Sequence, residues 1–153
     1  MSVPHLDRPA LAAPPGGRAA RRAAVLGCPV SHSRSPDLHL AAYRALGLAD
    51  WSYGRTECTA EQLPSVVGGA GSDHVGFSVT MPGKQAALAY ADERTERAAL
   101  VGSANTLVRT PAGWRADCTD IDGMIGALAD VGAGPGSAVL VGAGGTAAPT
   151  VAA

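Results

Sequence analysis

Residues 137–147 read SAVLVGAGGTA, an apolar run that leads directly into a glycine-rich turn. The run Ser137–Val141 is typical of a buried strand in a parallel sheet. The turn fits G-x-G-x-x-[GA], in which the first two glycines allow a tight turn and close approach of a pyrophosphate, and the small last residue allows helix packing. The stretch therefore predicts the start of a dinucleotide-binding fold, with cofactor contacts at Gly142, Gly144, Gly145, Thr146 and Ala147.

Upstream of this stretch, short β-like runs alternate with helical patterns, which is the signature of an α/β sheet. We expect strands at 24–26, 51–58 and 75–80, a hairpin of 105–109 with 114–116, and helices at 35–46, 60–67, 84–91, 94–101 and 119–131. The predicted fold is an open mixed sheet flanked by helices, followed by the first strand and glycine turn of a nucleotide domain.

Two of the expected helices have readable ends and faces. Ser35 and Pro36 suit the cap and first position of one helix, and Gly47 would end it. Hydrophobic spacing predicts which faces are buried. For the two helices these faces consist of Leu38, Ala42, Ala45 and Leu46, and of Met124, Ile125, Leu128 and Val131.

The bulk composition is that of a globular chain without a marked charge bias. Apolar residues make up 46% of the 153 residues and the net charge is −1, which gives no argument for a nucleic-acid or membrane partner. Residues 1–22 hold four arginines and one acid, and we expect them to form a flexible leader. No secretory signal or apolar run of about 18 residues is present, so a cytoplasmic protein is expected. Three widely spaced cysteines and scattered histidines predict neither a disulfide framework nor a metal site.

Polar clusters follow the predicted strands at the positions where α/β sheets bind ligands. The clusters are Ser31–Pro36, Ser78–Lys84, Ser103–Thr106 and Asp117–Asp120. Their hydroxyl, amide, ammonium and carboxylate groups suit a small ligand that carries hydroxyls and a carboxylate. Each residue also has a structural interpretation, since Ser35 and Asp120 could cap helices and Lys84 could be a solvated charge.

The order of these motifs resembles that of the shikimate dehydrogenase family. Residues 27–36 (GCPVSHSRSP) are similar to its opening motif G-x-P-x-x-H-S-x-S-P, and residues 79–84 (VTMPGK) to V-T-x-P-x-K. Residues 102–107 (GSANTL) resemble G-A-x-N-T-L, Thr119-Asp120 resembles the end of N-T-D, and the glycine turn resembles the family's nucleotide turn. Five motifs in register are a specific match.

The resemblance implies NADP-dependent interconversion of 3-dehydroshikimate and shikimate, a step of aromatic amino acid (chorismate) biosynthesis. It implies that Ser33 and Ser35 hold the substrate carboxylate. It also assigns the ring hydroxyls to Thr80, Lys84, Asn105 and Asp120, with Lys84 and Asp120 as the catalytic pair.

The chemical role of Lys84 has two interpretations. Proton transfer by an amine at neutral pH needs a pKa lowered from about 10.4, whereas a neighbouring carboxylate raises it. Lys84 is therefore either the base or a positioned donor that stabilises a developing alkoxide, with Asp120 orienting it. The chain has Leu40, Ser78 and Cys118 where the family usually has Asn. We expect Ser78 and Cys118 to adjoin the pocket and Leu40 to be a packing change.

The resemblance divides the chain into a leader (1–22), a shikimate-binding domain (23–117), a connecting helix and linker (118–136) and an incomplete Rossmann domain (137–153). The resemblance implies NADP as the cofactor. The residue that would read the ribose 2′ group is expected about 20 positions past the glycine turn, beyond Ala153, so NAD stays open. Two alternatives remain, a quinate/shikimate dehydrogenase that uses NAD and a non-catalytic shikimate-binding module. We expect residues beyond about 133 to be poorly packed. We also expect that the 153 residues alone do not turn the substrate over. A homodimer stays open.

Overall fold

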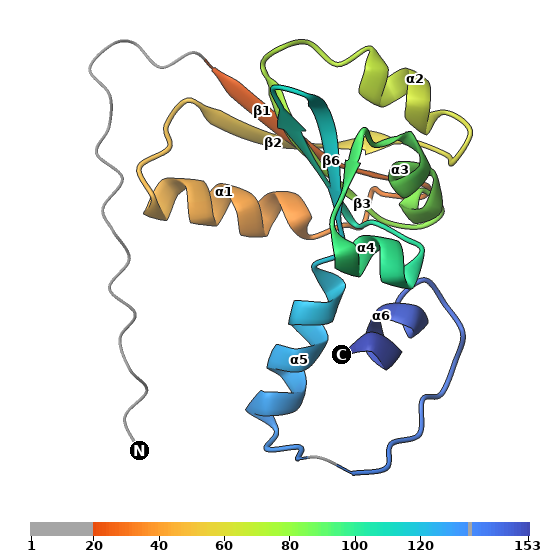
Figure 1. Ribbon diagram of the computed structural model, residues 1–153. Helices are drawn as coiled ribbons and strands as arrows, with labels where there is room; N and C mark the ends of the chain where they lie inside the picture. The colour runs from red at the N-terminus through yellow and green to blue at the C-terminus, as the bar shows by residue number, and fades with distance from the viewer. Residues whose placement is uncertain (1–19, 135) are drawn as a thin grey trace.

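A six-stranded mixed sheet, in the order β2-β1-β3-β5-β6-β4, is the framework of the computed structural model (Figure 1). The structure describes residues 20–153 except residue 135, so most of the expected leader lies outside the described residues. The strands are β1 (Arg21–Gly27), β2 (Trp51–Glu57), β3 (His74–Val79), β4 (Glu93–Arg94), β5 (Thr106–Thr110) and β6 (Gly113–Asp117). The predicted mixed α/β fold is confirmed.

Helices cover both faces of the sheet. β1 pairs in parallel with β2 and β3, and β5 and β6 form an antiparallel hairpin beside β3. One face carries α1 (Ser35–Ala45), and the other carries α2 (Leu63–Gly68) and α3 (Lys84–Tyr90) (Figure 1). The chain continues through α4 (Glu96–Val101), α5 (Asp120–Asp130) and α6 (Ala147–Ala152), and α5 and α6 lie beyond the sheet. No helix among the described residues is long and apolar enough to span a membrane.

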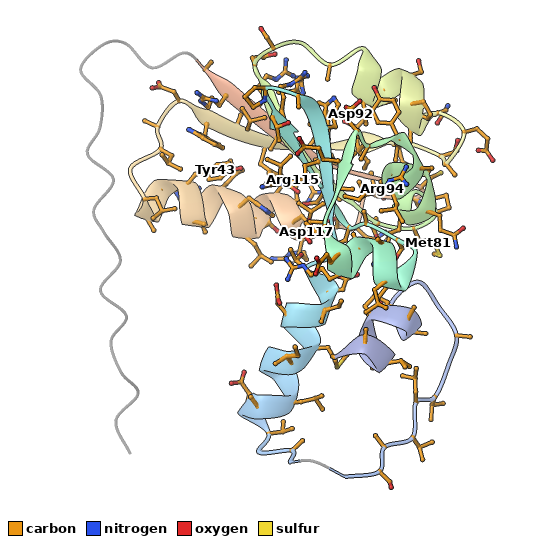
Figure 2. All side chains as sticks on the ribbon, in the orientation of Figure 1. Tyr43, Met81, Asp92, Arg94, Arg115 and Asp117 are labelled. Carbon is orange, nitrogen blue, oxygen red and sulfur yellow. The ribbon has the colours of Figure 1, made fainter. Side chains whose placement is uncertain are left out.

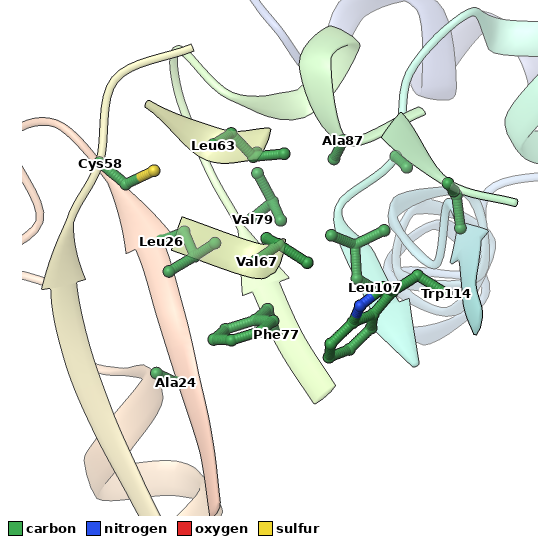
Figure 3. Packing of buried hydrophobic residues seen from close by; sticks show 13 residues of the cluster. Ala24, Leu26, Cys58, Leu63, Val67, Phe77, Val79, Ala87, Leu107 and Trp114 are labelled. Carbon is green, nitrogen blue, oxygen red and sulfur yellow. The ribbon is translucent and has the colours of Figure 1, made fainter. Parts of the chain in front are cut away.

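The main core lies between the sheet and the α2–α3 layer (Figure 3). Leu26 and Leu107 come from two strands and are at most 1% exposed. Leu63 and Val67 of α2 pack against them from the helix layer. Burial of these side chains stabilises the sheet by roughly 1.5–3 kcal/mol each.

Several predicted boundaries differ from the structure. β1 begins at Arg21, so the last two residues assigned to the leader belong to the sheet. α2 begins at Leu63 rather than at residue 60, and β4 was not expected, because two residues are too short for a recognisable pattern. α1 begins at Ser35 itself and has no side-chain cap hydrogen bond, so Ser35 is not the cap.

The predicted buried face of α1 is wrong. Leu38 and Leu46 are 70% and 60% exposed. The helix instead packs through Leu40 and Tyr43 against Val25 and its neighbours, which confirms that Leu40 is a packing residue. Tyr43 joins an aromatic ring to a polar hydroxyl, so the spacing of apolar residues alone does not predict that it packs against the sheet.

The predicted burial of one face of α5 and of the run at 137–141 is also wrong, whereas the expected poor packing beyond about residue 133 agrees with the exposure of that run. Ile125, Leu128 and Val131 are 49%, 42% and 78% exposed, and Ile121 is the buried residue of α5. Ser137–Val141 does not form a strand, and within it Val139 and Val141 are 90% and 93% exposed. No strand of the described residues pairs with this run, so its backbone groups have no ladder to join.

The topology places the predicted polar clusters at one edge of the sheet. The carboxyl ends of β1, β2 and β3 share that edge because the three strands are parallel. β5 runs antiparallel to β3 and so begins there, and β6 returns to it. The segments 28–35, 80–84, 103–106 and 117–120 therefore meet, although they lie far apart in the sequence.

Candidate active site

A polar pocket of about 470 Å³ lies at this edge of the sheet. It is lined by all six residues that the motifs assign to the substrate. These are Ser33, Ser35, Thr80, Lys84, Asn105 and Asp120. Its lining combines serine and threonine hydroxyls with the amide of Asn105, the ammonium of Lys84 and the carboxylate of Asp120.

Lys84 and Asp120 form an ion pair within the pocket. Lys84 is the first residue of α3, Asp120 is the first residue of α5, and the Nζ–Oδ2 distance is 2.6 Å. Their side chains are only 15% and 22% exposed, so water screens the pair less than a surface pair. Asp120 also suits the positive end of the helix dipole.

Asn105 holds the other oxygen of Asp120. Its Nδ2 donates to Asp120 Oδ1 at 2.7 Å and to Thr119 Oγ1 at 3.0 Å. Its Oδ1 accepts from the backbone N of Thr119 at 3.0 Å and from Thr106 Oγ1 at 2.8 Å. The amide thus joins the start of β5 to the start of α5, and it fixes the position of the Asp120 carboxylate.

Ser33 and Ser35 are close enough to act on one ligand group. Ser33 Oγ donates to Ser35 Oγ at 3.2 Å and accepts from the Ser35 backbone N at 3.3 Å. Arg55 of β2 donates from Nε and Nη2 to the Ser33 carbonyl at 2.9 and 2.6 Å. This double contact fixes the loop after β1, and Arg55 belongs to none of the motifs of the sequence analysis.

Thr80 packs directly against the end of β1. Its backbone N donates to Leu26 O at 2.8 Å, and a Cβ on Gly27 would clash with its Cγ2. Glycine at position 27 is therefore required for the close approach of the two strand ends.

The sequence-family model of the shikimate dehydrogenase substrate binding domain matches residues 25–107, which is more than half of the chain. The chain belongs to the shikimate dehydrogenase family. It is 41% identical over 105 residues to shikimate dehydrogenase (NADP(+)) of Microcystis aeruginosa, covering 68% of this chain and 36% of that protein.

Solved structures show the same likeness to the family. The shikimate dehydrogenase of Mycobacterium tuberculosis superposes with a TM-score of 0.70 at 72% identity and covers 71% of this chain and 41% of that one. The enzyme of Thermus thermophilus, solved in complex with shikimate, superposes with a TM-score of 0.78 at 36% identity and covers 86% of this chain and 51% of that one. The chain thus spans about half of these relatives or less.

Ser78, which stands where the family usually has Asn, lines the pocket as expected. Tyr53 OH donates to Ser78 Oγ at 2.7 Å, and burial raises the pKa of Tyr53, which keeps the phenol protonated. The Ser78 proton is then free to be donated to a ligand. His39 stacks on Tyr53 with ring centroids 3.9 Å apart and also lines the pocket. Neither Tyr53 nor His39 belongs to the motifs that carried the sequence analysis.

The expectation that Cys118 adjoins the pocket is wrong. Its side chain is fully buried and packs with Ala98 and Ile121, away from the pocket lining. Burial raises the pKa of the Cys118 thiol, which keeps it neutral and unreactive. Cysteine behaves here as a small apolar side chain under the first turn of α5.

The glycine turn lies across a second cavity from the catalytic-pair candidates. This cavity of about 400 Å³ is lined by Thr80, Lys84 and Ser103 on one side and by Gly144, Gly145 and Thr146 on the other. Gly142 has φ +116, a conformation that L side chains rarely adopt. A Cβ at Gly144 would meet no atom within 4 Å, so the backbone of the turn is open to a ligand.

A larger hollow of about 540 Å³ shares His39 and Ser78 with the candidate site. Its lining combines aromatic and aliphatic side chains with Arg21 and Arg109 and includes no lysine or carboxylate. It shares His39 with the smaller pocket but has no ammonium–carboxylate pair, so the smaller polar pocket, which holds Lys84 and Asp120, is the better candidate for chemistry.

Proposed function

We propose that this chain supplies the substrate domain and catalytic pair of an NADP-dependent shikimate dehydrogenase. The proposal rests on one observation, the partly buried Lys84–Asp120 pair facing a pocket that also holds Ser33 and Ser35. In this proposal residues 23–117 form the substrate domain and 118–136 connect it to a nucleotide domain that begins at 137.

The substrate in this proposal is shikimate or 3-dehydroshikimate. Ser33 and Ser35 would hold its carboxylate, because their hydroxyls lie 3.2 Å apart and can both donate to one anionic group. Thr80 and Lys84 would bind ring hydroxyls. Both amide protons of Asn105 already point to Thr119 and Asp120, so a ring hydroxyl that uses Asn105 must displace one of these contacts.

The ion pair favours the second interpretation of Lys84. With Asp120 2.6 Å away, Lys84 is held as a charged donor, and its ammonium can stabilise negative charge on the reacting oxygen. In the oxidation direction the hydroxyl proton would then pass to water rather than to Lys84, while the carbon that carries the hydroxyl would give up hydride to the bound nicotinamide. Comparing Lys84→Ala with Lys84→Arg tests this role, since full activity of the Arg variant would exclude proton transfer by the residue.

Cofactor binding is proposed at the glycine turn. Gly142, Gly144, Gly145, Thr146 and Ala147 would hold the pyrophosphate, and the open backbone of the turn fits such a group. When bound, NADP supplies the nicotinamide that accepts or donates hydride. The cavity between the turn and Lys84 supports this proposal, because the nicotinamide ring would need space beside Lys84.

A second candidate, a shikimate-binding module without redox activity, is favoured by one observation. The run before the glycine turn is unpaired and exposed, so the nucleotide site lacks the strand that would normally hold it. For the same reason we propose that these 153 residues bind the substrate without turning it over. A quinate-preferring or NAD-linked enzyme is the alternative within the family.

Selective labelling tests the proposal cleanly, because Lys84 is the only lysine of the sequence. Protein made with ¹³Cε-lysine gives one lysine signal, which titration with shikimate should shift in a saturable way. Ser33→Ala should weaken binding, whereas Ser72→Ala, outside this pocket, should not. An unchanged lysine signal at saturating shikimate would sink the proposed substrate, and quinate run in parallel decides between the two acids.

A further inference from the structure

Arg97 of α4 joins three parts of the chain next to the candidate site. Its Nε and Nη2 donate to the two oxygens of Asp117 at 2.6 and 2.5 Å. Its Nη1 donates to Asp122 Oδ2 at 2.5 Å. A planar guanidinium that bonds one carboxylate with two parallel N–H groups fixes orientation as well as distance. Arg97 therefore connects the end of β6 to the first turn of α5.

Asp117, the last residue of β6 (Figure 2), takes part in most of these contacts. Besides Arg97, its Oδ1 accepts from Thr95 Oγ1 at 2.7 Å and from the Cys118 backbone N at 2.8 Å. Thr95 also caps α4 by accepting from the Ala98 backbone N at 3.3 Å. The hydrogen bonds and charge of Arg97 hold the pKa of Asp117 at about 2, so the carboxylate is charged at neutral pH.

The contacts continue into the candidate site within three residues. The backbone O of Asp117 accepts from Asn105 N at 3.1 Å, and the Asn105 side chain holds Thr119 and Asp120. Segment 117–120 is thus fixed on one side by Arg97 and on the other by Asn105. The first turn of α5, which carries Asp120 next to Lys84, therefore has contacts to both Arg97 and Asn105.

We propose that Arg97 is a positioning residue for the catalytic pair, acting through Asp117 and Asp122 to fix the first turn of α5 and so the Asp120 carboxylate. Arg97 does not line the substrate pocket, so its effect is indirect. The assignment of Asp120 as catalytic rests on the proposed function, whereas the mechanical link from Arg97 to Asp120 does not.

The test uses Asn105, which is the only asparagine of the sequence. Asparagine labelled with ¹⁵N at Nδ2 gives a single side-chain amide group, and this group bonds Asp120 directly. In Arg97→Ala we expect both amide protons to shift and their exchange with water to accelerate about tenfold, as for loss of a hydrogen bond to a charged group. Arg94→Ala is the matched control, because Arg94 is exposed and makes only a 3.4 Å contact to a backbone carbonyl.

The outcomes are separable. An Asn105 amide that is unchanged in folded Arg97→Ala overturns the proposal, as does an equal change in Arg94→Ala. If Arg97→Ala does not fold, Asp122→Asn weakens only the contact between Arg97 and the exposed Asp122 side chain. It should shift the same Asn105 signals by less. Shikimate binding by the unaltered chain is measured separately, so failure of the proposed substrate leaves the Asn105 result interpretable.

Discussion

β1 and the run Ser137–Val141 are both short and apolar, yet only β1 is a strand. β1 has hydrogen-bonded neighbours on both sides, and its Leu26 is 1% exposed. Residues 137–141 have no neighbour in the described sheet, and Val141 is 93% exposed. The difference shows that an apolar run becomes a strand only when other strands satisfy its backbone groups.

Hydrogen exchange should show the largest contrast between these two segments. Amides of Ala24–Leu26 should exchange only through global unfolding, whereas those of 138–141 should exchange close to the rate of an unstructured peptide. Two-dimensional NMR after transfer to D₂O measures both in one sample. Strong protection of 138–141 in a monomer would break the comparison and indicate pairing that the described structure lacks.

Side-chain truncation should give the next largest contrast. Leu26→Ala removes a buried side chain and should lower the free energy of unfolding by about 2–5 kcal/mol. Val141→Ala removes an exposed one and should change it by less than about 0.5 kcal/mol. Urea unfolding followed by tryptophan fluorescence is suitable, because Trp114 lies in the main core. Equal effects of the two substitutions would contradict the assigned difference in burial.

The free energy of unfolding should depend on pH through Asp117, which lies where the sheet ends and the chain enters α5. Its folded pKa of about 2 lies below the ordinary value of 3.8, so its contribution is present above about pH 4 and is lost as the pH falls toward 2. The shift corresponds to about 2 kcal/mol. Stability measured from pH 5 to pH 2 should therefore fall more steeply in the unaltered chain than in Asp117→Asn. Parallel curves would mean that Arg97 does not stabilise the charged form.

The smallest expected change in stability is that caused by removing the Thr95 side chain, which caps α4. Thr95→Ala removes the side chain that accepts from Ala98 N and donates to Asp117, and it should lower stability by about 1 kcal/mol. Thr95→Ser keeps the hydroxyl and should restore most of that loss. Thermal unfolding of the three proteins side by side measures the difference, and no rescue by serine would exclude capping as its cause.

Local sequence signals predicted much of the sheet and the placement of the site. Pro82 and Gly83 ended β3 near the expected position, and the motif residues from Ser33 to Asp120 do share one pocket. Burial of helix faces was not predictable, because it depends on which layer covers each helix. Ile125 has suitable spacing for a core residue, but α5 lies beyond the sheet and contacts the short helix α6, and Ile125 is 49% exposed.

The supporting residues of the site were the least predictable part. Arg55, Tyr53 and Arg97 act through partners 20 or more positions away in the sequence. Their spacing follows no local period, so only the topology of the sheet brings them to the residues that they support around the pocket. Cys118 shows the opposite case, since it stands where the family usually has Asn and is expected at the pocket, but its side chain packs with Ala98 and Ile121.

Asn105 has a consequence for chemical ageing of the protein. Its side chain is both donor and acceptor, and each end faces a group of the opposite kind. Slow hydrolysis of this one amide would replace the donor with a second carboxylate opposite Asp120. The two like charges at positions 105 and 120 would then repel each other. The protein would keep its mass almost unchanged and its sheet intact, yet stored material would gradually lose the geometry around Lys84.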